Sequence, residues 1–110
     1  MRNLKKGHYA ELMAAAILTR NDYDVFHPLQ GHGPIDLVAI KCDETLLLDV
    51  KADASRLVKN RTIPTRITRT RTAVQKQLDV RIAYLDVEAG RLHITDHESD
   101  CQDARPLVLT

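Results

Sequence analysis

The sequence has little of what several functional classes require. Trp is absent, and Phe26 with three Tyr residues makes up all the aromatics, which argues against a platform on which nucleic-acid bases stack. The only two cysteines, Cys42 and Cys101, lie far apart and form no CxxC motif or Cys/His cluster, so neither a zinc site nor a redox pair is expected. No apolar run is long enough to span a membrane, and the apolar stretch near the start contains Glu11, unlike a signal peptide. We therefore expect an intracellular, cytoplasmic protein with reduced thiols and no membrane contact.

The length and composition predict one compact domain, residues 1–110. An apolar share of 44% and a charged share of 28% are ordinary for a globular protein. The formal net charge of +1 conceals a marked asymmetry, because residues 54–78 contain seven Lys or Arg and no Asp or Glu. A charge run is usually a solvated surface, but a basic stretch this concentrated also suits the phosphates of a nucleic acid.

The apolar pattern predicts a helix followed by two hairpins. An Ala-rich helix, apolar nearly all round and therefore buried, is expected over residues 8–20, followed by a first strand over 23–29. A hairpin over 35–52 turns within "KCDET". Pro64 argues against a continuous helix in the basic stretch, and a short helix is expected over 72–78. A second hairpin joins 80–87 to 91–95, and the last residues form an edge strand or a frayed end. This order predicts an α/β fold, a mixed central β-sheet with flanking helices.

The first hairpin carries charges where its strands are otherwise apolar. Asp49 and Lys51 point to the same face, because side chains alternate along a strand. The turn decides where Asp36 lies. A two-residue turn at Cys42 and Asp43 places it opposite Asp49, a two-residue turn one position later or a four-residue turn places it opposite Lys51, and a three-residue turn sends it to the other face.

Two carboxylates gathered on one face suit a hard divalent cation such as Mg²⁺, which takes oxygen ligands and keeps part of its hydration shell. Lys51 beside them would position a water or stabilise charge on a phosphate. Glu11 is the only charge between Lys6 and Arg20 and lies on a mainly small, apolar helix face, so it could complete the same site. The alternative is that Asp49 and Lys51 form an ordinary surface salt bridge at a strand end.

The order of these motifs resembles that of PD-(D/E)xK nucleases. The matching features are a GxxxE helix start from Gly7 to Glu11, the strand "DYDVFHP", "PID" ending at Asp36, and "DVK" from Asp49 to Lys51. The match covers about half of the chain. Within the family, the sequence resembles the small members most, namely the group I intron homing endonucleases and the archaeal-type Holliday junction resolvases. The long helix that many resolvases place before the second hairpin is short or absent here.

The resemblance implies a restriction-endonuclease-like core of α-β-β-β-α-β type and a single nuclease domain that hydrolyses DNA phosphodiester bonds with Mg²⁺, for which Mn²⁺ would substitute. It implies Glu11, Asp36, Asp49 and Lys51 as the catalytic residues, with the carbonyl of Val50 joining the three acids as metal ligands. A homodimer is expected, because two strands must be cut. The basic Arg/Thr pattern favours the homing type over a junction resolvase; a non-catalytic DNA-binding module and an RNA-processing nuclease are the remaining alternatives.

The DNA itself, duplex or four-way junction, is expected to contact the basic segment 54–78 and the start of the first helix. The residues predicted to bind it are Lys5, Lys6, Arg56, Lys59, Arg61, Arg66, Arg69, Arg71 and Lys76.

Overall fold

A computed structural model describes residues 3–52, 55–57, 64–66, 70–95 and 107–110, and within them the chain forms two helices and eight strands. The elements, in chain order, are α1 (Asn3–Arg20), β1 (Asp24–Phe26), β2 (Leu37–Lys41), β3 (Glu44–Ala52), β4 (Ser55–Leu57), β5 (Pro64–Arg66), α2 (Ala73–Leu78), β6 (Arg81–Asp86), β7 (Arg91–Ile94) and β8 (Leu107–Leu109). Every element predicted from the sequence is present, and the last residues form the edge strand β8.

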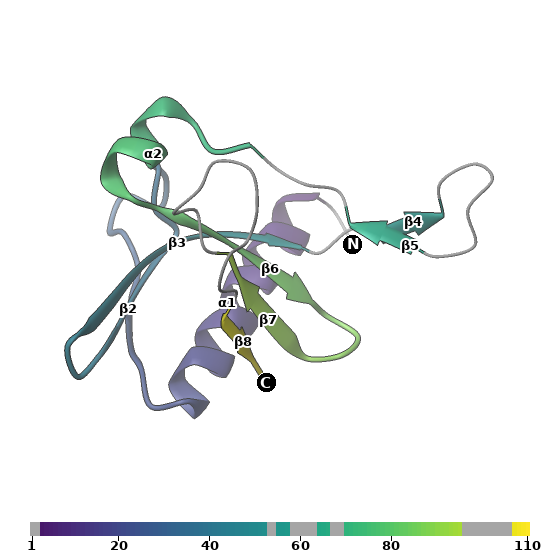
Figure 1. Ribbon diagram of the computed structural model, residues 1–110, viewed down its shortest axis with the longest axis horizontal. Helices are drawn as coiled ribbons and strands as arrows, with labels where there is room; N and C mark the ends of the chain where they lie inside the picture. The colour runs from purple at the N-terminus through teal and green to yellow at the C-terminus, as the bar shows by residue number, and fades with distance from the viewer. Residues whose placement is uncertain (1–2, 53–54, 58–63, 67–69, 96–106) are drawn as a thin grey trace.

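The described strands form a six-stranded mixed sheet in the order β1-β2-β3-β6-β7-β8, and β4 and β5 form a separate antiparallel pair (Figure 1). β2 and β3 pair antiparallel, with Lys41 opposite Glu44, so the turn consists of Cys42 and Asp43 alone. Cys42 takes a positive φ of 52°, as tight hairpin turns require. β3 then pairs parallel with β6, which places the first hairpin beside the second and makes the sheet mixed, as predicted.

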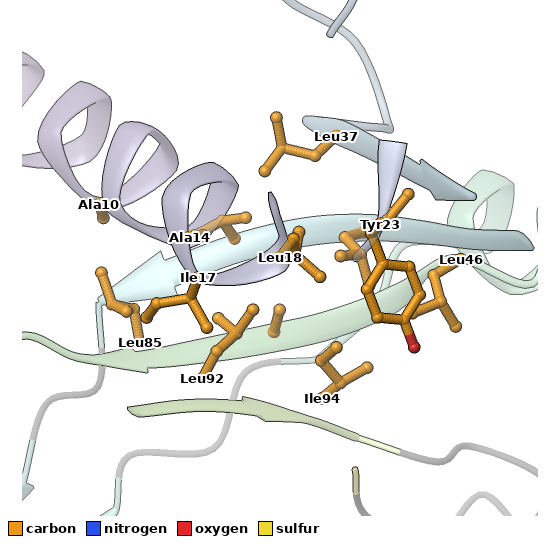
Figure 2. Close-up of a cluster of buried hydrophobic side chains, with 14 residues drawn as sticks. Ala10, Ala14, Ile17, Leu18, Tyr23, Leu37, Leu46, Leu85, Leu92 and Ile94 are labelled. Atoms are coloured by element: carbon orange, nitrogen blue, oxygen red, sulfur yellow. The ribbon is translucent and has the colours of Figure 1, made fainter. Parts of the chain in front are cut away.

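Helix α1 lies across one face of this sheet and buries one side of itself there (Figure 2). Ala10, Ala14, Ile17 and Leu18 follow the spacing of one helical face and are all at most 3% exposed. Leu12, on the other side of the helix, is 58% exposed, so the prediction of a helix buried all round is wrong. The apolar residues at the other positions are mostly Ala, which indicates helix propensity rather than burial.

The helix also begins at Asn3, five residues before the predicted start at His8. Gly7 lies inside it, and a Cβ added there would meet nothing within 4 Å. The glycine therefore neither ends the helix nor serves a close contact.

Strand β3 divides its residues between the two faces of the sheet. Leu46, Leu48 and Val50 are buried and belong to the hydrophobic core under α1. The alternate residues, Asp49 and Lys51, therefore point to the opposite face. The sheet thus provides a rigid support for both charged side chains at the end of its central hairpin.

The short helix α2 precedes β6 and is fixed at both ends. Thr72 caps its first turn, and Asp79 ends it in the left-handed conformation with φ 58°. The β4–β5 pair extends away from the six-stranded sheet (Figure 1). No helix of the described residues is long and apolar enough to cross a membrane.

Candidate active site

The register of the first hairpin brings Asp36 and Asp49 together. Leu37 pairs with Leu48, so Asp36, one residue before β2, lies opposite Asp49. This is the arrangement expected for a two-residue turn at Cys42 and Asp43. The backbone N–H of Asp36 donates to the carbonyl of Leu48 over 2.8 Å, which continues the ladder to the acid itself.

The main chain of β3 also holds the side chain of Asp36. The backbone N–H of Val50 donates to Oδ2 of Asp36 over 2.8 Å. Asp36 is therefore attached to the neighbouring strand through both its backbone and its carboxyl group, and its position relative to Asp49 is set by the sheet.

Bringing the two acids together makes ionisation of Asp36 unfavourable. Burial raises its pKa from 3.8 to about 7, reinforced by the hydrogen bond with the Asp49 carboxyl group and by the negative charges of Asp49 and Glu11. The hydrogen bond from Val50 acts in the opposite direction. Two carboxyl groups this close therefore resist being ionised together.

Lys51 supplies one positive charge to this site. Its Nζ lies 3.5 Å from Oδ1 of Asp49, and the two side chains are 43% and 13% exposed. The ammonium group therefore lies at the edge of the site, where water reaches it, and the carboxylate lies deeper. This contact alone is compatible with an ordinary surface salt bridge and with a lysine that takes part in catalysis. The residues around the pair distinguish these two interpretations.

Those surroundings are an open cavity of about 570 Å³, lined by Asp36, Asp49 and Lys51 from the hairpin and by Glu11 from α1. The four residues predicted to be catalytic thus line one space, together with Val50 of β3 and Gln75 of α2. Glu11 is also 3.8 Å from Nδ1 of His8 on its own helix. A carboxylate cluster beside an ammonium group in a cavity is a feature of a binding site rather than of an isolated surface ion pair.

The donor set fits a hydrated divalent cation held by two carboxylates. Among the described residues no three His, Cys, Asp or Glu side chains are arranged to hold a metal ion together. Glu11 therefore lines the cavity without forming a three-acid cluster with Asp36 and Asp49. Mg²⁺ is compatible with this arrangement because it binds through one or two carboxylates and keeps several waters. A cation bound between the two carboxyl groups would relieve the repulsion that helps to raise the pKa of Asp36.

Gln75 belongs to the site, and the sequence reasoning missed it. Its Nε2 donates to Oδ2 of Asp49 over 2.8 Å and to the carbonyl of Pro34 over 3.0 Å. The spacing of Thr72 and Gln75 matches a capping box, so the sequence did carry a signal for the helix start. It carried none for the contact with Asp49, which depends on how α2 packs on the hairpin.

The predicted DNA-binding residues are placed unequally. Lys5 and Lys76 are exposed on α1 and α2, whereas Arg71 is buried, with Nη1 donating to the carbonyl of Val80 over 3.2 Å. The placement of Arg71 corrects the expectation that it faces DNA, because its guanidinium group supports the backbone leading into β6. Lys6 lies in α1, Arg56 in β4 and Arg66 in β5. Lys59, Arg61 and Arg69 lie outside the described residues.

The structure is similar to that of a known nuclease. No protein-family model matches the sequence, and no curated protein matches it. A solved structure of a bacterial homing endonuclease, I-Ssp6803I, superposes with a TM-score of 0.61 at 18% sequence identity, over 100% of this chain and 79% of that chain. At this identity the likeness establishes the fold. The chain has the restriction-endonuclease-like fold that its resemblance to the PD-(D/E)xK nucleases implied.

Proposed function

We propose that this chain, which has the fold of a bacterial homing endonuclease, is a divalent-metal-dependent DNA endonuclease of the homing type. The observation that carries the proposal is the convergence of Asp36, Asp49 and Lys51 on one cavity at the end of the central hairpin. We propose further that residues 1–110 act as one nuclease domain and that the segment 54–78 contacts the DNA.

In this proposal Asp36 and Asp49 would hold Mg²⁺, or Mn²⁺ in its place, with the carbonyl of Val50 and bound water. Glu11, which lines the same cavity from α1, would complete or orient the site. Bound Mg²⁺ would supply positive charge for the scissile phosphate and would lower the pKa of a coordinated water. Phosphodiester hydrolysis needs no redox or organic cofactor besides the metal ion.

The remaining steps belong to side chains of the chain itself. Lys51, half-exposed and beside Asp49, is placed to hydrogen-bond the attacking water or a phosphate oxygen. Its positive charge stabilises the negative charge that develops on the phosphate in the transition state. Asp49 orients the ammonium group, and Val50 orients the carboxylate of Asp36 through its backbone N–H.

The homing type is preferred over a Holliday junction resolvase for one structural reason. The basic segment contains the β4–β5 pair, which extends from the body of the molecule. A two-stranded ribbon of this kind fits the major groove of duplex DNA, where Arg reads guanine. A homodimer is proposed with it, because a single cavity must serve two strands.

The proposal is tested by incubating the protein with Mg²⁺ and three substrates: plasmid DNA carrying candidate target sites, four-way junctions, and structured RNA. If the wild-type protein cleaves duplex DNA and the Asp49→Asn variant does not, the result supports the homing type. Cleavage of junctions alone would reassign the chain as a resolvase, and cleavage of RNA alone as an RNA-processing nuclease. Salt-sensitive binding without cleavage under any of these conditions would indicate a non-catalytic DNA-binding module. Sedimentation equilibrium tests the dimer.

A further inference from the structure

Gln75 is a buried polar side chain whose every hydrogen-bonding group is used. It is 6% exposed and lies in the first turn of α2. Its Oε1 accepts from the backbone N–H of Thr72 over 3.0 Å, and its Nε2 donates to Asp49 and to the carbonyl of Pro34. Burial of an amide is costly unless its groups are paired, and the pairing of this one includes a carboxyl group of the candidate site.

The orientation of this amide follows from its partners. The backbone N–H of Thr72 can only donate, so the atom facing it must be the oxygen of Gln75. The carbonyl of Pro34 can only accept, so the atom facing it must be the nitrogen. The group that meets Asp49 is therefore an N–H donor, and its acceptor is a carboxylate oxygen.

Two consequences concern the acids. Gln75 donates a hydrogen bond to Oδ2 of Asp49, whereas Lys51 lies near the other carboxylate oxygen, Oδ1. The same amide holds Pro34, two residues before Asp36. One side chain thus connects the segment that carries one acid to the carboxyl group of the other, and it selects which oxygen of Asp49 remains available to the cavity.

From this geometry we infer that Gln75 is a positioning residue for the metal site, and that it acts by fixing the rotamer of Asp49 and its distance from Asp36. The inference rests on the proposed nuclease function. Partners that hydrogen-bond to metal-binding carboxylates orient them, and the amide of Gln75 is placed for that task. Gln75 does not itself face a reacting atom in this assignment.

The test uses Gln75→Met, which removes the amide at nearly constant length. We expect kcat at saturating Mg²⁺ to fall about 10- to 100-fold, the range found when such orienting partners are removed. DNA binding with Ca²⁺ in place of Mg²⁺ should be unchanged. In the absence of DNA, the affinity for Mn²⁺, measured by titration calorimetry, should weaken about 10-fold or more.

The matched control is Gln77→Gly in the same helix. Gln77 is exposed and does not line the cavity, and Gly at that position weakens α2 through its backbone entropy alone. We expect this variant to lose thermal stability while keeping kcat and Mn²⁺ affinity. Equal losses of activity in the two variants would show that Gln75 acts only through the folding of α2 and would overturn the inference.

A second variant covers the case in which Gln75→Met fails to fold. Gln75→Glu keeps an oxygen opposite the N–H of Thr72, and so keeps the capping box, but replaces the donor to Asp49 with an acceptor. The same fall in kcat is expected, and a wild-type kcat in this variant would overturn the inference.

The outcomes separate the two proposals. If the wild-type protein cleaves DNA and Gln75→Met retains both kcat and Mn²⁺ affinity, the inference fails and the nuclease function stands. If the wild-type protein cleaves no substrate but Gln75→Met weakens Mn²⁺ binding, the function fails and the positioning role stands. If the wild-type protein neither cleaves nor binds Mn²⁺, both are overturned.

Discussion

The backbone N–H of Val50 donates to Oδ2 of Asp36 over 2.8 Å, so a strand of the central hairpin holds the acid that precedes the other strand. Through this bond the geometry of the two acids depends on the ladder between β2 and β3 rather than on a loop. Sheet ladders are among the more rigid parts of a protein, and a site that binds an ion between two carboxylates benefits from such support.

The first prediction concerns Asp36→Asn. An Asn oxygen can still accept from Val50, and its amide can donate to Asp49, so the fold is kept while one of two repelling charges is removed. We expect a higher melting temperature than wild type at pH 8 without metal, together with loss of Mg²⁺-dependent cleavage. Asp43→Asn, at the exposed turn of the same hairpin, is the control and should change neither quantity. A lower melting temperature for Asp36→Asn would contradict the proposed repulsion.

The second prediction concerns pH. Because folding raises the pKa of Asp36 from 3.8 to about 7, the folded protein binds more protons than the unfolded chain between these values. The contribution of this group to the free energy of unfolding is therefore fully present below about pH 4 and is lost as the pH rises through about 7. Mg²⁺ competes with the proton, so its stabilising effect should be larger at pH 8 than at pH 6.

Thermal melts of wild type and Asp36→Asn across this pH range, with and without Mg²⁺, check the second prediction. The difference in stability between the two proteins should depend on pH only when metal is absent. A difference that is constant with pH in the metal-free proteins would show that Asp36 ionises normally.

The third prediction concerns Lys51→Ala. The ammonium group is half-exposed and pairs with Asp49 over 3.5 Å, so its loss should cost little stability. We expect the variant to bind DNA like wild type in a mobility-shift assay while its rate of cleavage falls at least about 100-fold, because one charge-stabilising contact in the transition state is lost. Loss of DNA binding together with folding would instead indicate a structural role for Lys51.

Much of the fold could be predicted because the apolar pattern of the strands is unambiguous. Leu46, Leu48 and Val50 alternate with Leu47, Asp49 and Lys51, as expected of a strand with one buried face. The turn could not be predicted, because "KCDET" is compatible with several turn lengths and a shift of one residue inverts the strand. The structure has the two-residue turn in which Cys42 tolerates a positive φ.

The parts that the sequence did not predict depend on long-range packing. Gln75 reaches Asp49 across 26 positions of the chain, and no local pattern encodes where a six-residue helix packs. Arg71 was predicted to bind DNA from its place in a basic run, but tertiary structure uses it to hold the carbonyl of Val80. A charge run gives the composition of a segment and not the direction in which each side chain points.

The fourth prediction concerns the core that supports the site. Leu48 is fully buried between α1 and the sheet, one residue before Asp49. Leu48→Ala removes apolar contacts and leaves a cavity, so the free energy of unfolding should fall by about 2–5 kcal/mol. Leu12→Ala, at a position that is 58% exposed, is the matched control and should change it by less than about 0.5 kcal/mol. Urea denaturation measures both, and equal effects would show that Leu48 is not part of the core.

The fifth prediction concerns the salt dependence of DNA binding. Residues 54–78 contain seven basic residues, but the buried Arg71 should not contribute, which leaves at most six phosphate contacts from this segment. Each phosphate contact on duplex DNA contributes about −0.9 to the slope of log K against log salt concentration. Six contacts therefore give a slope whose magnitude is no greater than about 5. Arg56→Ala, in β4, should reduce the magnitude of the slope by about one unit and weaken binding to all sequences alike.

Arg91, exposed on β7, carries the same charge on a strand outside this segment. Arg91→Ala should therefore leave the slope unchanged, and fluorescence anisotropy titrations at several salt concentrations measure both variants. Equal slopes for wild type and Arg56→Ala would show that Arg56 does not contact phosphates. A slope of smaller magnitude for Arg91→Ala would indicate that the DNA contacts the second hairpin. Because a lost ion pair with phosphate changes the slope whereas a misfolded strand weakens binding at every salt concentration, the slope separates a role in DNA contact from a role in stability.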